Sequence, residues 1–294
     1  MIHRGKGTEK KCINQLLYKK DINELLVVEN SVYLRGIMSI KSELDYYYEL
    51  YHKPDFIAND PILLPHRFTR KEDIEIIGFF VALIAWGQRV SIIRSGERLI
   101  ELFHQSPYDF IVNHSDKDLK QCLTFVHRTF NSDDLLSLIA YLKYLYIEKK
   151  GLEGAFSEGL SKNSKTVETA LTGFREGFEK SEFALPRTLK HIASPAKGSA
   201  CKRLNMYLRW MVRKDDKGID FGIWESISPS QLICPLDVHV LKQAAALGLI
   251  KEGKGDWKTA LELSNKLRRY DPSDPVKYDF ALFGKGVNEQ RETL

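Results

Sequence analysis

Apolar residues recur at helical spacing along most of the chain from residue 39 onward. In the first half, this periodicity predicts helices over 39–52, 92–104, 116–124, 132–148 and 165–178, and a more apolar helix between Thr69 and Trp86. Thr69 followed by Glu72 has the spacing of a capping box at the start of that apolar helix. In the second half, the pattern predicts helices over 185–193, 202–213, 238–247, 257–268 and 275–283. Alternating β-branched residues are nearly absent, so we expect an all-α fold of about ten helices.

The regular pattern begins only at Met38, because residues 1–37 show little periodicity. We therefore expect residues 1–37 to be a flexible or non-native N-terminal extension. Residues 38–287 are expected to form a single helical unit, followed by a short tail over 288–294.

Composition narrows the class of protein. Apolar residues make up 43% and charged residues 28% of 294 positions, as in ordinary globular proteins. No apolar run approaches the ~20 residues needed to cross a bilayer, and the N-terminus lacks the pattern of a signal peptide. The four cysteines are far apart and have no CxxC spacing, which predicts reduced thiols and no metal site. We expect a cytoplasmic protein, monomeric and without a membrane partner.

The net charge of +5 is unevenly distributed. Residues 1–37 hold seven basic and four acidic side chains, whereas the segment 183–214 holds eight basic side chains and no acidic one. A charge run is commonly a solvated face of a protein. Here it surrounds a candidate nucleophile, so a surface that binds a polyanion is an equally good interpretation.

Two helices joined by the turn 194–199 are predicted in this basic segment, and Lys202 lies at the start of the second helix. Backbone amides at such a helix start can hold a phosphate without reading a base, so Lys197, Gly198, Ser199 and Arg203 are candidate DNA contacts. A lysine that loses its proton can attack a sugar carbon and hold it as a Schiff base. The helix dipole and the neighbouring Arg203 favour the neutral amine, although a solvated lysine in a first helical turn is common.

Asp237 follows Lys202 by 35 residues, within the string Pro-Leu-Asp-Val-His at the start of another helix. Aspartate is a good N-cap, which is a purely structural role. The same geometry holds a carboxylate rigidly, where it can stabilise a developing cation. His239 would lie near the same helix end and is a candidate phosphate contact, although a single histidine is more often structural.

At these residues the sequence resembles the helix–hairpin–helix superfamily of base-excision DNA glycosylases. In that superfamily a hairpin binds phosphate, a lysine opens the second helix, and an aspartate precedes Val-His or Thr-His. Lys202 and residues 235–239 match these elements, and their wide separation is similar to that in the archaeal 8-oxoguanine glycosylase branch. Residues 83–91 and 274–287 resemble, more loosely, the wedge segment and the closing helix. The turn 194–199 departs from the glycine-rich hairpin of the superfamily, and the cysteines of its iron–sulfur members are missing. The chain also looks like a bacterial family of similar size with the strings PHRF, RLNMYLRWM and PLDVH.

The resemblance implies a glycosylase with AP-lyase activity that acts on double-stranded DNA. It also implies two lobes within the helical unit with a cleft between them, one of about 69–180 and one of about 38–68 together with 181–287. Lys202 would attack C1′ of a flipped nucleotide, Asp237 would stabilise the sugar cation, and Gln88 or Arg89 would fill the gap in the duplex. The expected base is an oxidised purine such as 8-oxoguanine, and no metal or organic cofactor is required. The candidate residues of the base pocket are Phe125, His127, Arg128, Phe280 and Trp210.

Two other classes of function remain open from the residues alone. One is a non-catalytic DNA-binding module, specific for a lesion or a structure, that has the same fold. The other is a role in binding RNA or an acidic protein through the basic stretch. The presence of both Lys202 and Asp237 favours the enzyme, because a pure binding protein needs neither.

Overall fold

The computed structural model describes residues 39–58, 60–251 and 253–292 of the chain. Two compact units divide the chain, Met1–Glu43 and Leu44–Leu294, and the second contains nearly all described residues. The predicted extension 1–37 lies outside the described residues. The division of the second unit into two lobes stays a prediction.

The fold is all-α, as predicted, apart from one short pair of strands. The α-helices of the described residues are α3 (Ile40–Tyr51), α4 (Asp55–Ala58), α5 (Lys71–Ile84), α6 (Arg89–Leu102), α7 (Pro107–Asn113), α8 (Asp116–Cys122), α9 (Ser132–Glu148), α10 (Gly151–Ser157), α11 (Glu168–Glu179), α12 (Lys202–Val212), α13 (Val238–Ala246), α14 (Trp257–Tyr270) and α15 (Tyr278–Glu292). The 3-10 turns are η1 (Pro61–Leu63), η2 (Pro65–Arg67), η3 (Thr188–Lys190), η4 (Pro195–Lys197), η5 (Pro229–Gln231) and η6 (Pro275–Lys277). Strands β1 (Val126–His127) and β2 (Phe130–Asn131) pair antiparallel. Among the described residues, no helix is both long and apolar enough to span a bilayer.

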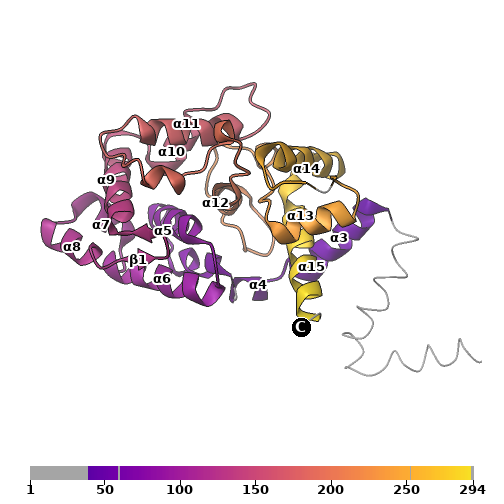
Figure 1. Cartoon of the computed structure of the whole chain (residues 1–294), viewed down its shortest axis with the longest axis horizontal. Coiled ribbons are helices and arrows are strands. Elements are labelled where there is room, and N and C mark those ends of the chain that lie inside the picture. The colour runs from indigo at the N-terminus through magenta and orange to yellow at the C-terminus, as the bar shows by residue number, and fades with distance from the viewer. Residues whose placement is uncertain (1–38, 59, 252, 293–294) are drawn as a thin grey trace, which may run out of the picture. The chain divides into compact units, whose positions relative to one another are not determined.

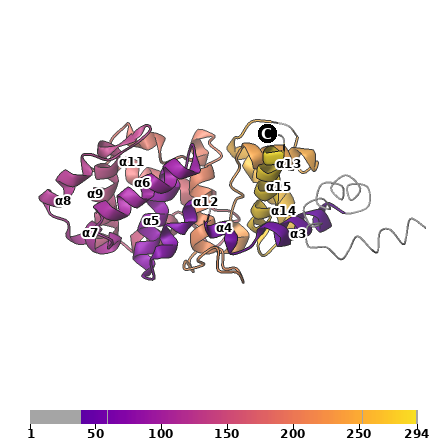
Figure 2. The ribbon, with the colours of Figure 1, turned by 90° about the horizontal axis from the view of Figure 1, so that it is seen from below.

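Helix α12 lies at the centre of the second unit. Figure 1 shows α5–α11 gathered on one side of α12 and α13–α15 on the other, and Figure 2 shows the same order from below. Most α12 side chains are buried, including Tyr207, which packs edge-on against Phe79 of α5 and Trp224 of the loop that follows α12. The Tyr207 hydroxyl donates a hydrogen bond to the Glu75 carbonyl oxygen at 3.1 Å. A helix buried on nearly all sides can carry side chains from the core to a pocket at its end.

One predicted helix cap and one predicted helix are wrong. Thr69 does not cap α5, because the N-cap position is Arg70, whose side chain makes an ion pair with Glu72 at 3.2 Å. The segment 185–193 forms only the 3-10 turn η3. Its backbone carbonyls at Leu189 and Ile192 accept hydrogen bonds from Arg175 of α11, so they do not continue a helix.

The predicted end of the helical unit at residue 287 also differs from the structure. The predicted helix 275–283 begins as the 3-10 turn η6, and the α-helix proper starts at Tyr278. Helix α15 then runs to Glu292, into the predicted tail 288–294.

Candidate functional site

Lys202 is the first residue of α12, as predicted. The N-cap residue Cys201 has a φ of 49°, a left-handed conformation that is uncommon for a residue other than glycine. Its N–H donates to the Ser199 hydroxyl at 3.1 Å, and its carbonyl accepts from the Asn205 N–H at 2.8 Å. The buried Asn205 side chain also donates to the Ala200 carbonyl at 3.0 Å. These bonds fix the backbone from which the Lys202 side chain projects.

Asp237 is the N-cap of α13, as predicted. Its Oδ1 accepts hydrogen bonds from the N–H groups of His239 and Val240, each at 2.9 Å. The first turn of α13 is itself held close to α15 at Gly286, where a Cβ would lie 2.9 Å from the His239 Cβ. The cap and the close helix contact together hold the Asp237 carboxylate in one orientation.

The two candidate catalytic side chains face each other. Lys202 Nζ lies 3.5 Å from Asp237 Oδ2, the oxygen that takes no part in capping α13. The Lys202 side chain is 37% exposed and that of Asp237 is 12% exposed. An ion pair with so much solvent contact stabilises a fold only weakly.

The pair lies on the wall of a pocket of about 830 Å³. Segments from both sides of α12 contribute to this pocket. Its aromatic residues are Phe56, Trp86 and Phe283, together with the imidazole of His239. Its charged residues are Arg89, Lys202, Arg203 and Arg209, and the carboxylates Asp60, Asp237 and Asp279. The pocket is therefore partly aromatic and holds both signs of charge.

Two further carboxyl groups in the pocket are buried. Burial raises the pKa of Asp60, although Oδ1 accepts a hydrogen bond from the Ile62 N–H at 3.1 Å. Burial also raises the pKa of Asp279 to about 6, against the opposing charge of Arg209. An Arg209 guanidinium N–H donates to Asp279 Oδ2. Asp279 can therefore change its charge within the physiological pH range, close to Lys202 and Asp237.

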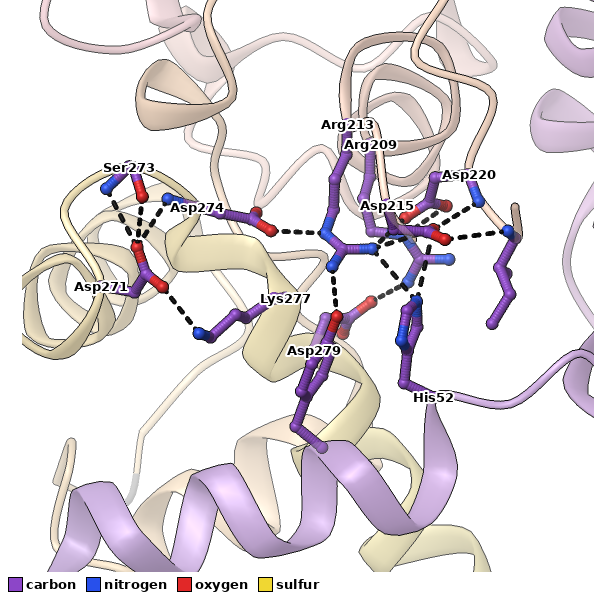
Figure 3. A network of polar contacts seen from close by, with 12 residues as sticks. His52, Arg209, Arg213, Asp215, Asp220, Asp271, Ser273, Asp274, Lys277 and Asp279 are labelled. Carbon is purple, nitrogen blue, oxygen red and sulfur yellow. Dashed lines mark hydrogen bonds and ion pairs between the residues drawn. The ribbon is translucent and has the colours of Figure 1, made fainter. Parts of the chain in front are cut away.

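A buried polar network continues from Arg209 away from the pocket (Figure 3). Arg209 Nε donates to Asp220 at 3.2 Å, and Arg213 Nη1 donates to Asp220 and to Asp215, each at 3.1 Å. Arg213 Nε donates to Asp274 at 2.8 Å. Burial alone would lower the pKa of Arg209, but Asp220 and Asp279 raise it overall, so the guanidinium stays charged. The network joins the C-terminal half of α12 to the segment before α15.

A family model described as "Protein of unknown function (DUF2400)" matches residues 60–288, most of the chain. The chain belongs to the DUF2400 family. No curated protein and no solved structure matches it. Apart from Phe56, every residue named above as lining the pocket lies inside the matched segment. The pocket is thus part of the DUF2400 segment of the chain.

The predicted wedge residues of this DUF2400 protein lie at the start of α6. Gln88 occupies the exposed N-cap position of that helix, and Arg89, its first residue, lines the pocket. Arg203 also lines the pocket, but its guanidinium donates to the Leu83 carbonyl and lies over the Trp86 ring. The Arg203 guanidinium therefore binds the end of α5 and the residues after it. The sequence instead predicted Arg203 as a phosphate contact.

The other predicted DNA contacts lie around the same pocket. Lys197 is exposed in η4, and Gly198 ends that turn with a φ of 75°. Ser199 and His239 both line the pocket, and the His239 ring packs edge-on against Phe283 at 6.1 Å. Four of the predicted contacts therefore line the pocket: Arg89, Ser199, Arg203 and His239. Gln88, Lys197 and Gly198 precede lining residues in the sequence but do not line the pocket themselves.

The five predicted base-pocket residues do not line this pocket. Phe125, Trp210 and Phe280 are core side chains, each at most 2% exposed. His127 is buried behind Trp86, with its Nδ1 bonded to a serine hydroxyl, and Arg128 is exposed at the β1–β2 turn. Sequence spacing alone could not separate core aromatics from pocket aromatics.

The pocket residues that sequence reasoning missed come from separate segments. Asp60 precedes a proline turn, a common capping position that gives no functional signal. Arg209 lies seven residues after Lys202, on the same face of α12, and this spacing could have identified it. Asp279 and Phe283 share a face of α15 by the same rule. Nothing in the sequence marked Trp86 as a pocket residue except its position two residues before Gln88. Within the described part of the chain, no group of three or more potential ligands is placed to hold a metal ion.

Proposed function

We propose that this DUF2400 protein is a DNA glycosylase with associated AP-lyase activity, acting on an oxidised purine such as 8-oxoguanine. The observation that carries the proposal is the position of Lys202 Nζ, 3.5 Å from Asp237 Oδ2 on the wall of an aromatic and charged pocket. A lysine and a fixed carboxylate are the two groups that Schiff-base chemistry at a sugar requires. The chemistry needs neither a metal nor an organic cofactor.

In the proposed reaction, the Lys202 amine gives up a proton and attacks C1′ of the flipped nucleotide. The C1′–N bond breaks, its electron pair leaves with the base, and the base takes up the proton. Asp237 stabilises the positive charge that develops on the sugar, because its carboxylate is already held in place by the α13 cap. Opening of the sugar ring gives the Schiff base, and loss of a C2′ proton then expels the 3′ phosphate.

The size and lining of the pocket support a nucleotide as ligand. A volume of about 830 Å³ lies in the usual range for small-molecule sites and is large enough for an extruded base with its sugar. The rings of Trp86 and Phe283 contribute to the lining, and flipped bases are commonly held between aromatic and apolar side chains. Flipping costs a few kcal/mol and is least costly for a damaged base, which contributes to selectivity.

The edge of the pocket supports a DNA duplex as the partner. Gln88 and Arg89 are placed at a helix start beside the pocket, where either can enter the gap left by the flipped nucleotide. Lys197 lies on the other segment that precedes α12 and offers the charge of its exposed side chain to phosphate, whereas the N–H groups of Lys197 and Gly198 donate to the carbonyls of Ser194 and Pro195. We expect a monomer to carry out the reaction, because Lys202 and Asp237 come from one chain.

Borohydride trapping on duplexes with 8-oxoguanine, with an abasic site or with neither tests the proposal. The wild-type protein should form a covalent adduct on the 8-oxoguanine duplex, and Lys202→Gln should form none while still binding DNA. Lys242→Gln, which removes an exposed lysine on α13, is the matched control and should trap like the wild type. An adduct that survives in Lys202→Gln would refute the assignment of the nucleophile.

The same experiment separates the enzyme from its alternatives. A non-catalytic DNA-binding module would bind the duplexes with strong salt dependence, release no base and leave no adduct. A protein that recognises RNA would bind single-stranded or structured RNA more tightly than any of the duplexes.

A further inference from the structure

A second segment is hydrogen-bonded to the turn that precedes Lys202. This second segment comprises residues 253–258, Gly-Lys-Gly-Asp-Trp-Lys, which are the end of the loop between α13 and α14 and the first two residues of α14. Asp256 forms an isolated antiparallel bridge with Ser199, and the Trp257 N–H donates to the Gly198 carbonyl at 3.0 Å. Ser199 and Gly255 both line the pocket. Two segments far apart in the sequence thus meet at one edge of the pocket.

This junction exposes positive charge. Lys197, Lys254 and Lys258 are exposed, and within the described residues no ion pair joins any of them to an acidic side chain. The nearby carboxylate of Asp256 is engaged in capping α14, because Oδ1 accepts from the Thr259 N–H and hydroxyl, each at 2.9 Å. These bonds, with the charges of Lys258 and Lys254, lower the pKa of Asp256, so it stays ionised. Lys254 and Lys258 act on the Asp256 carboxylate, and the exposed Lys197 side chain precedes Gly198 in the opposing turn, so exposed positive charge gathers on both segments of the junction.

The backbone at the junction is open as well. Gly198 has a φ of 75°, and a Cβ added to Gly198 or to Gly255 would meet no heavy atom within 4 Å. A phosphate can therefore come close to the junction, where the lysine ammonium groups supply the contacts, because the Gly198 N–H donates to the Pro195 carbonyl at 2.8 Å. Flexible lysine side chains beside open glycine backbone suit a repeating phosphate chain better than one ligand with a fixed shape.

We propose that Lys197, Lys254 and Lys258, with Gly198 and Gly255, form a phosphate-binding surface for the backbone of duplex DNA beside the pocket. This inference rests on the proposed function for the choice of duplex DNA as the polyanion. The surface acts by charge, so it contributes affinity to every sequence and is independent of the base removed. Its continuity with Ser199 places the bound strand next to Lys202.

The salt dependence of DNA binding tests this surface. The double variant Lys254→Gln/Lys258→Gln is compared with the wild type on an undamaged duplex by fluorescence anisotropy at increasing KCl. The slope of log K against log salt is negative, and each lost phosphate contact reduces its magnitude by ~0.9. We therefore expect the magnitude of the slope to fall by about 1 to 2. The control is Lys117→Gln/Lys120→Gln, which removes the same charge from exposed positions of α8 and should leave the slope unchanged.

Each result has a defined meaning for the surface. A slope that falls only in Lys254→Gln/Lys258→Gln supports it, whereas an unchanged slope, or an equal fall in the α8 control, overturns it. Tighter wild-type binding of single-stranded RNA than of duplex DNA also overturns it. Absence of a trapped adduct on 8-oxoguanine, together with the expected fall in slope, would refute the glycosylase and leave the DNA surface standing.

Discussion

The guanidinium carbon of Arg203 lies 4.6 Å from the centre of the Trp86 ring, and an Arg203 N–H donates to the Leu83 carbonyl. The residue next to the candidate nucleophile therefore anchors the segment that leads into α6. A cation–π contact of this kind contributes about 1 kcal/mol, and a charged donor to a carbonyl contributes more. Arg203 thus ties the start of α12 to the segment that carries Trp86 on the pocket wall.

Replacing Arg203 should therefore affect stability before it affects DNA binding. Arg203→Met should lower the free energy of unfolding by about 1–3 kcal/mol, because the Leu83 carbonyl is left without its donor. Urea unfolding measures the change, and Lys202→Gln is a control that leaves this contact intact. Unchanged stability with a reduced salt dependence of DNA binding would instead make Arg203 a phosphate contact.

Two substitutions of Asp237 should separate its capping from its charge. Asparagine caps a helix about as well as aspartate, so Asp237→Asn should keep its stability yet form the trapped adduct more slowly, by on the order of 10²-fold. Asp237→Ala should lose the cap too, at a cost of about 1 kcal/mol. Thermal unfolding and single-turnover trapping measure the two effects. Equal trapping rates for the wild type and Asp237→Asn would show that Asp237 acts only as a helix cap.

The charge of Asp279 should shape the pH dependence of the reaction. Its carboxylate pairs with Arg209, and burial raises its pKa to about 6. Protonation below pH 6 leaves Asp220 as the carboxylate still bonded to Arg209 and adds positive charge near Lys202 and Asp237, which opposes the sugar cation of the proposed reaction. The wild-type trapping rate should fall as the pH drops through about 6.

In Asp279→Asn the trapping rate should not change around pH 6. Above pH 6 it should equal the lower rate that the wild type shows below pH 6. The control Asp109→Asn, at an exposed position of α7, should show the same dependence of trapping rate on pH as the wild type. If Asp279→Asn also lost activity as the pH fell through 6, a group other than Asp279 would be responsible.

A second buried carboxyl should make the stability of the protein depend on pH. Glu75 accepts hydrogen bonds from Tyr146 and from Trp224, each at 2.7 Å, and burial raises its pKa to about 7. The folded state thus holds this proton more tightly than the unfolded state, whose value is 4.5. Its contribution to stability is complete below about pH 4.5 and is lost as the pH rises through 7.

Glu75→Gln should remove that loss, because the amide stays neutral and can still bond both partners. Between pH 4.5 and 7, the wild type should lose on the order of 2–3 kcal/mol of unfolding free energy relative to Glu75→Gln. Urea denaturation at several pH values measures the difference. Glu101→Gln, at an exposed position of α6, is the control and should run parallel to the wild type. A constant difference between wild type and Glu75→Gln across this range would contradict the shifted pKa.

The sequence predicted long helices well and short elements poorly. Helix α9 has the predicted bounds, because a capping box at Asn131 supports a pattern that repeats over several turns. Helices α7 and α10 span fewer than two turns each, too few for a periodic signal, and were missed. The segment 185–193 has an apolar pattern, but side-chain bonds from Arg175 take its backbone carbonyls. Such tertiary competition for backbone groups cannot be read from local spacing.

The same distinction applies to the candidate site. Lys202 and Asp237 were identified because each lies at a helix start within a recognisable string, and the structure places them together. Asp60, Trp86 and Asp279 were not, because their relation to the pocket depends on segments brought together by packing around α12. Spacing predicts which residues share one helix face, whereas a pocket wall combines faces of several helices.

Helix α12 is fastened at both ends, by Asn205 and its neighbours at the start and by Arg213 at the end. The backbone amides of such a helix should exchange with solvent only when the whole unit unfolds. Entry of a ligand therefore cannot rely on α12 moving aside. The first turn of α13 is fixed as well, by the Asp237 cap and by the close approach of Gly286, although Val238 in that turn is 74% exposed. Lys202 and Asp237 therefore both project from anchored helix starts, so a ligand has to fit a pre-formed pair of side chains.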